Sequence, residues 1–199
     1  MKKTIVCVMA GVAIVSSLGC QGVHARENEV KAKTGGASME FLQRSYHLGS
    51  YNQKSNPMWE FVTGKETVDN WTSLLTLIER NDASSKEELD RLAQGILTNY
   101  KSRNGQILLA KTMVGKAGQV FNYMAVAFED PAQHRFELSF TKVALGSKSA
   151  YVLVYGVRIG DPDYLNKAKA FLNEHSSEIG RALENAALPD LGSLPRKEF

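Results

Sequence analysis

Two stretches of the chain place apolar residues at three- and four-residue spacing. The first starts at Ser85, whose side chain can accept from the first-turn amides while Glu88 reaches back, and its apolar stripe ends near Gly105. The second starts at residues 161–163, where Asp161 is a capping acid and Pro162 takes the first helical position. The second stripe has a charged opposite face, and the two stripes predict two helices that are separated by about 55 residues.

Between the two predicted helices the apolar period changes to two, which predicts strands. Four such runs are separated by turn residues and cover residues 106–114, 120–128, 134–145 and 150–159. In the third run, Phe136, Leu138 and Phe140 alternate with polar residues, so we expect one buried face and one that meets water or a ligand. The fourth run is apolar on both sides, which indicates a strand inside a sheet that is covered twice.

Before the first helix, three shorter apolar runs indicate further strands, over residues 41–48, 59–63 and 71–78. Short connections between successive strands require antiparallel pairing. We therefore predict an α+β domain: an antiparallel sheet of about six or seven strands with helices packed on it.

The ends of the chain have a different composition. Lys2 and Lys3, an apolar run over residues 4–18 and a small-residue end are typical of an export signal, which we expect to be cut after Ala25. The alternative is a lipoprotein box ending at Cys20, whose lipidation would tether the chain to a membrane. We further predict a flexible leader over 26–38, one domain over 39–188 and a loose C-terminal tail over 189–199.

Cysteine use and charge restrict the setting of the mature chain. Cys7 and Cys20 both precede the expected cut, so the mature chain can form no disulfide. Removing residues 1–25 takes two lysines and no acid from the formal charge of +3, which leaves +1. This balance indicates no nucleic-acid partner. We expect a periplasmic or secreted protein that meets a membrane only if Cys20 is lipidated.

Motifs for catalysis are missing from the mature sequence. No Gly-x-Ser-x-Gly pentapeptide occurs, no cysteine remains for thiol chemistry, and the histidines lack metal-ligand spacing. We therefore predict no catalytic residue, no metal and no cofactor. A hydrolase with a dispersed site, such as His134 with Glu129, is kept as an alternative.

A resemblance adds to this interpretation. Residues 64–76, above all Val68-Asp69-Asn70-Trp71-Thr72, together with the following helix, strand meander and closing helix, resemble mostly uncharacterised exported bacterial proteins. The order of elements over about residues 39–188 is similar to the Mog1/PsbP-like α/β sandwich superfamily. The resemblance implies a binding, assembly or envelope-accessory role, and it supplies no catalytic motif.

Aromatic residues gather in the same part of the chain as that segment. An exposed cluster could form a protein-docking edge, and core packing is the alternative, especially for Trp71, since Leu75 and Leu77 follow on its side of the strand. The candidate binding residues are Tyr46, Tyr51, Trp59, Asp69, Asn70 and Trp71.

These observations lead to a functional hypothesis. The chain is expected to be an exported, non-enzymatic protein that binds an envelope or secreted protein partner, as an accessory or immunity-type factor of a secretion or competition system. The alternatives are a periplasmic carrier that holds a small ligand between sheet and helix, and the dispersed-site hydrolase.

Overall fold

The computed structural model describes residues 37–53, 56–115, 118–186 and 191–196. The predicted signal, Cys20 and leader residues 26–36 lie outside this range. In the described residues, one antiparallel sheet has the strand order β1-β2-β3-β4-β8-β7-β6-β5. The strands are β1 (Ser38–Phe41), β2 (Arg44–Asn52), β3 (Met58–Thr63), β4 (Ser73–Arg80), β5 (Gln106–Val114), β6 (Val120–Asp130), β7 (Arg135–Leu145) and β8 (Ala150–Gly160).

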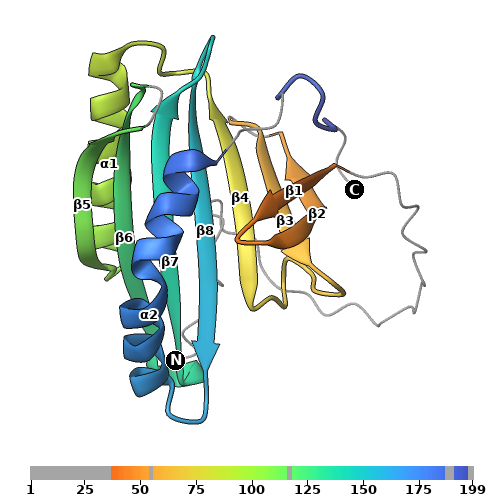
Figure 1. The fold of residues 1–199 in the computed structure, drawn as a ribbon, viewed down its shortest axis with the longest axis vertical. Coiled ribbons are helices and arrows are strands. Elements are labelled where there is room, and N and C mark those ends of the chain that lie inside the picture. Colours follow the sequence, from red (N-terminus) through yellow and green to blue (C-terminus); the bar gives the residue numbers. More distant parts are fainter. Residues whose placement is uncertain (1–36, 54–55, 116–117, 187–190, 197–199) are drawn as a thin grey trace, which may run out of the picture.

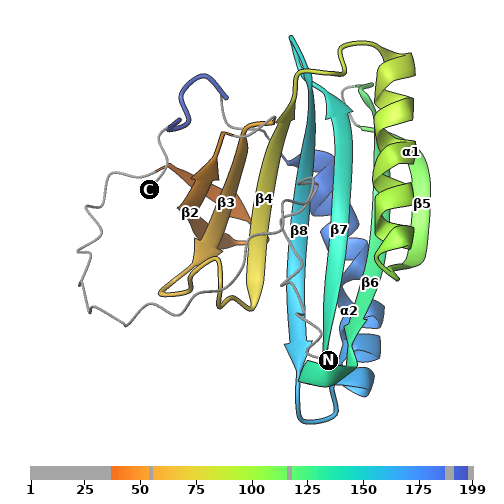
Figure 2. The same cartoon turned by 180° about the vertical axis from the view of Figure 1, so that it is seen from behind.

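Two α-helices cover opposite faces of the sheet, α1 (Lys86–Ser102) on one side and α2 (Tyr164–Asn185) on the other (Figures 1 and 2). A short 3₁₀ turn, Pro131–Gln133, joins β6 to β7. Neither α-helix of the described part is both long and apolar enough to serve as a membrane span. The predicted α+β class with an antiparallel sheet is confirmed.

The described sheet has eight strands, whereas six or seven were predicted. The difference arises in the run 41–48, which contains the hairpin between β1 and β2. Leu42 and Gln43 both have positive φ, 49° and 59°, in the turn. This left-handed pair is normally supplied by Asn or Gly, so the sequence carried no turn signal here.

The first helix agrees with its predicted start. Ser85 accepts from the Glu88 amide, and the Glu88 side chain accepts from the Ser85 amide, which forms a complete capping box. The second helix begins two residues later than predicted: Asp163 is the N-cap residue, and its carboxylate accepts from the Asn166 side chain. The assignment of Asp161 as the cap was wrong, because Asp161 pairs with His134 at 3.1 Å.

Both faces of the sheet carry a hydrophobic core. Ile179 and Leu183 of α2 pack with aromatic residues of β3, β6, β7 and β8 on one face, and Leu89, Ile96 and Tyr100 of α1 pack on the other. The double cover of β8 is confirmed.

The prediction that one face of β7 meets water or a ligand is wrong, because Ser139 and Thr141 are buried on the α1 side. There Thr141 Oγ1 lies 2.9 Å from the Tyr100 hydroxyl. The α1 helix therefore covers polar positions that the alternation of β7 assigned to solvent or a ligand.

The C-terminal segment 191–196 packs on the domain, although 189–199 was predicted to be a loose tail. Leu194 is only 5% exposed and joins the α2-side core. Trp59 Nε1 donates to the Pro195 carbonyl at 2.7 Å, and Arg196 Nη2 donates to Glu79 Oε2 at 2.9 Å. One buried leucine and two directed contacts therefore hold the described part of this segment against β3 and β4.

Candidate functional site

Most of the predicted aromatic binding residues are core residues. Tyr46, Tyr51, Trp59 and Trp71 are all buried. The first three belong to the α2-side core, where Tyr51 and Trp59 have ring centroids 5.4 Å apart. Trp71 packs separately with neighbours from β3 and β4. These rings therefore form no exposed docking cluster, and the core-packing alternative describes them.

Asp69 and Asn70 are the two predicted binding residues that are exposed. They lie in a turn in which Thr67 and Asn70 exchange backbone hydrogen bonds of 3.1 Å. Arg158 holds this turn to β8: its guanidinium lies 3.9 Å from the centroid of the Trp71 ring, and its Nη1 donates to the Asp69 carbonyl at 3.3 Å. The segment is thus fixed to the sheet and offers only short polar side chains, those of Thr67, Asp69 and Asn70, to a partner.

A buried ion pair continues from this turn into the sheet. Glu137 is 4% exposed, and its Oε1 accepts from Arg158 Nε at 3.0 Å, with Arg135 Nη2 3.7 Å away. Glu137 Oε2 has no hydrogen-bond partner among the described residues. Burial raises the pKa of Glu137, while the Arg158 charge opposes that effect. The pair links β7, β8 and the Trp71 turn, which is a structural role.

Glu60 is a second buried carboxylate, on β3, and its Oε2 accepts from Ser50 Oγ at 2.7 Å. Burial raises the pKa of Glu60, the Ser50 hydrogen bond lowers it in part, and the Asp69 charge raises it. Since its pKa lies above the reference value of 4.5, folded protein binds more protons at this site than unfolded protein in the window between the two values. The contribution of Glu60 to stability therefore falls as pH rises through that window.

Replacing Glu60 with glutamine is expected to raise the free energy of unfolding at neutral and alkaline pH, and to change it little below pH 4.5. The Gln side chain can still accept from Ser50 but carries no charge to desolvate. Urea unfolding at both pH values measures the difference. Glu66→Gln is the matched control: burial raises the pKa of Glu66, but hydrogen bonds from Thr72 and Thr63 outweigh it and lower the pKa, so this variant should lose stability at neutral pH.

The proposed His134–Glu129 pair is not in direct contact. His134 Nδ1 lies 3.1 Å from Asp161 Oδ2, and its ring stacks on Tyr164, whose hydroxyl donates to Glu129 Oε1 at 3.0 Å. The His134 side chain is 63% exposed. In the described part of the chain, no group of three or more His, Cys, Asp or Glu side chains could hold a metal ion. The carboxylate that orients His134 is thus Asp161, and the pair sits on an open surface.

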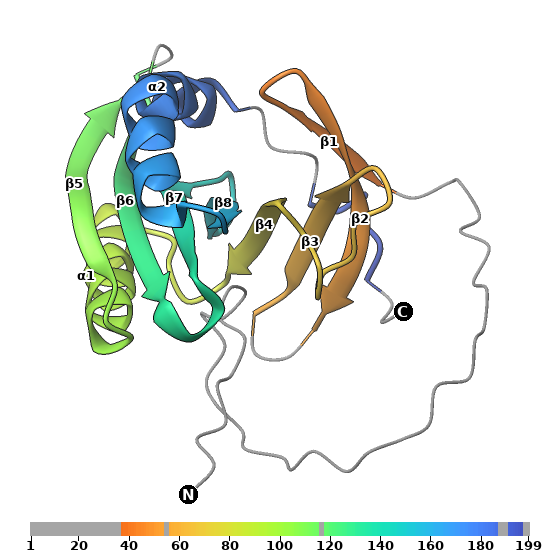
Figure 3. The ribbon, with the colours of Figure 1, turned by 90° about the horizontal axis from the view of Figure 1, so that it is seen from below.

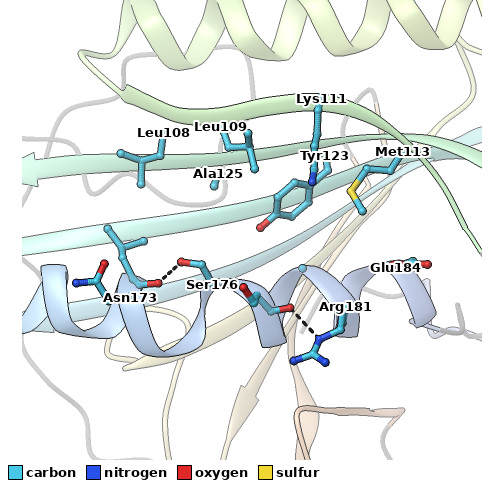
Figure 4. A pocket seen from close by; sticks show the side chains of 13 residues that line it. Leu108, Leu109, Lys111, Met113, Tyr123, Ala125, Asn173, Ser176, Arg181 and Glu184 are labelled. Atoms are coloured by element: carbon cyan, nitrogen blue, oxygen red, sulfur yellow. Dashed lines mark hydrogen bonds between the residues drawn. The ribbon is translucent and has the colours of Figure 1, made fainter.

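A groove of about 610 Å³ lies between α2 and the sheet strands β5 and β6 (Figure 4). It exists because α2 packs mainly on β7 and β8 and makes fewer contacts with β5 and β6. Its lining comprises Leu108, Leu109, Lys111, Met113, Tyr123, Ala125, Leu172, Asn173, Ser176, Ser177, Gly180, Arg181 and Glu184. Mostly apolar side chains from the sheet face mostly polar side chains from the helix across it.

Two helix positions set the shape of the groove. A Cβ atom on Gly180 would lie 3.8 Å from the Tyr123 hydroxyl, so glycine leaves open space above that ring. Burial raises the pKa of Tyr123 to about 12, so the phenol is neutral at physiological pH. Arg181 Nε donates to the Ser177 carbonyl at 3.3 Å, which holds the guanidinium along the helix (Figure 4). The groove therefore offers an apolar floor with a neutral hydroxyl and a charged rim.

The outer wall of the groove is β5, an edge strand of the sheet (Figure 3). Leu109 is 42% exposed on the groove side of this strand, and Val114 is 65% exposed on its α1 side. The sequence predicted this strand but not its place at an edge, because pairing order depends on the whole topology. The available signal was an apolar run with one charged residue, Lys111.

Comparison with protein-family models gives no match, and comparison with curated proteins gives none either. The geometry of the groove and of β5 is therefore the feature that bears on function.

Proposed function

We propose that this chain is an exported, non-enzymatic binding protein that holds an envelope or secreted protein partner at the groove and along β5. The observation that carries the proposal is the exposed apolar surface of β5, which borders a preformed groove. Monomeric proteins rarely leave such a strand open, because unpaired edge groups and apolar side chains promote association. A partner that covers this surface would pair the edge groups and bury the apolar side chains.

The export pattern at the N-terminus supports an envelope or extracellular setting, and the likeness to Mog1/PsbP-like sandwiches supports a binding or assembly role. We include both in the proposal, together with a place in a secretion or competition system. The eight-stranded sheet between two helices is compatible with such a sandwich. Fold analogy is a weak guide to function, so the test addresses the surface itself.

The proposal is tested by site-specific photo-crosslinking in the producing cells. A photoreactive amino acid is placed at Leu109 or Val114 on β5, or at the exposed Lys167 on α2 as a control. We expect the same adduct mass from both β5 positions and none from the control. Equal labelling from all three positions, or none from β5, would contradict the proposal.

Filling the groove with a larger side chain tests whether the groove takes part in partner binding. Gly180→Leu directs a side chain toward the Tyr123 hydroxyl, and we expect crosslinking yield or partner affinity to fall by about tenfold or more, a change of about 1.4 kcal/mol. Gly95→Leu is the matched control, because that helical glycine has open space around its Cβ position. If both variants bind the partner equally, the groove is not part of the binding surface.

A second candidate function is that of a small-ligand carrier. The groove volume of about 610 Å³ falls within the range of about 300–1,000 Å³ that ligand pockets occupy. Native mass spectrometry of freshly purified protein would then show an additional bound mass. That mass should disappear in Gly180→Leu and persist in Gly95→Leu, whereas a protein-binding groove gives no such mass.

A further inference from the structure

Resting on the proposed function, we infer that the partner joins the sheet as a ninth strand along β5. The bound segment is extended, carries alternating apolar side chains toward the groove, and places a carboxylate opposite Lys111. This assigns both the mode of binding and the chemistry of the partner segment.

The two edges of the sheet differ in a way that favours β5. The other edge strand, β1, has only four residues, and short edges are a common protection against pairing. β5 has nine residues, which matches an added strand about 30 Å long. Its protective features are a bulge between Ile107 and Leu109 and the single charge of Lys111. From Ala110 to Val114 the strand pairs regularly with β6 and presents a continuous outer edge.

The register between β5 and β6 fixes which side chains border the groove. Leu109, Lys111 and Met113 lie opposite Ala125, Tyr123 and Phe121, whose side chains belong to the α2 side of the sheet. The intervening residues of β5 face the α1 side. Alternate residues of an added strand would therefore lie beside Leu109, Lys111 and Met113, and the other residues would lie on the α1 side.

Charge selects the chemistry of the segment. The groove lining contains two cations, Lys111 and Arg181, and one anion, Glu184, which leaves a net charge of +1. Lys111 stands between two apolar neighbours on the groove side of β5. An opposite charge directly across an antiparallel pair is favourable, and a like charge there is unfavourable. An acidic residue flanked at two-residue spacing by apolar ones is therefore the complementary pattern.

A second copy of this chain fits this edge less well. Antiparallel pairing of two β5 strands about Ala110 would put the two Lys111 side chains on one face as diagonal neighbours, about 7–8 Å apart. The two lysines would therefore repel each other at the groove, where the proposed partner segment places a carboxylate. A heterologous segment avoids this repulsion.

The test uses a nine-residue synthetic probe with valine at odd positions, threonine at even positions and a central glutamate, and a companion probe with central lysine. Binding to the full chain is followed by fluorescence anisotropy and by ¹⁵N NMR of the β5 amides. We expect the glutamate probe to bind about fivefold more tightly than the lysine probe. Lys111→Glu should reverse that order, while Lys65→Glu, an exposed substitution in the turn between β3 and β4, should leave it unchanged.

Backbone methylation of the probe tests strand pairing directly. Alternate amides of an added strand point toward β5, so N-methylation of one alternate set should abolish binding and methylation of the other set should spare it. Equal effects of the two sets, or a probe that leaves the β5 amides unchanged, would overturn strand addition. If crosslinks from Leu109 persist in that case, the proposed function stands and only the binding mode fails. A mass of two chains bridged at β5 would instead identify a second copy.

Discussion

Arg158→Met is expected to lower the free energy of unfolding at about pH 8 by about 3–5 kcal/mol. The substitution leaves Glu137 buried without its closest cation and removes the guanidinium that lies over Trp71. It also removes the Nη1 donor to the Asp69 carbonyl. Urea unfolding followed by tryptophan fluorescence measures the loss, and Trp71, one of two tryptophans in the chain, reports release of the turn.

The pH dependence and a second substitution separate the electrostatic cause from loss of packing. In Arg158→Met, Glu137 has its pKa raised further above the unfolded value, so the deficit should shrink as pH falls and this carboxyl becomes protonated. Adding Glu137→Gln should recover more than half of the loss, because the buried carboxylate that has lost its closest cation is then replaced by a neutral amide. A deficit that is independent of pH and unchanged by Glu137→Gln would show that Arg158 acts through packing alone.

Local sequence patterns were sufficient to predict most of the helices and strands. The capping box at Ser85, the apolar stripe of α1 and the four runs after it correspond to α1 and to β5 through β8. These features depend on residues close in sequence, so periodicity reports them directly. The two-sided apolar pattern of β8 also predicted that both of its faces are covered, since a strand buried on both faces has no polar side to present.

Features that depend on contacts between residues distant in sequence could not be predicted from local patterns. The β1–β2 hairpin uses Leu42 and Gln43 in a left-handed turn that local propensity disfavours, and the strand pairing stabilises it. Ser139 and Thr141 look like solvent-facing residues until Tyr100 of α1 covers them. The same limitation concealed the candidate site, because the groove depends on where α2 packs and on β5 being the last strand.

Trp59→Ala has a comparably large expected effect, a loss of about 3–5 kcal/mol in the free energy of unfolding. The indole is fully buried in the α2-side core beside Tyr51, and removing it leaves a cavity that the β3 backbone cannot close. It also removes the donor to the Pro195 carbonyl and the ring beneath Arg196. Segment 191–196 should therefore lose protection in amide hydrogen exchange.

Trp59→Phe distinguishes the two roles of this side chain. Phenylalanine keeps most of the buried ring but cannot donate to Pro195, so the expected cost includes about 0.5–1.5 kcal/mol for that hydrogen bond. Exchange protection of 191–196 should fall in this variant while the β3 core stays protected.

Leu194→Ala probes the same attachment from the other side, and because the two residues share one cluster their costs should not be additive. Since β3 and β5 lie in opposite halves of the sheet, probe binding at β5 should be unchanged in Trp59→Phe. Unaltered protection of 191–196 in both Trp59 variants would show that Leu194 and the Arg196–Glu79 ion pair hold the segment without the indole.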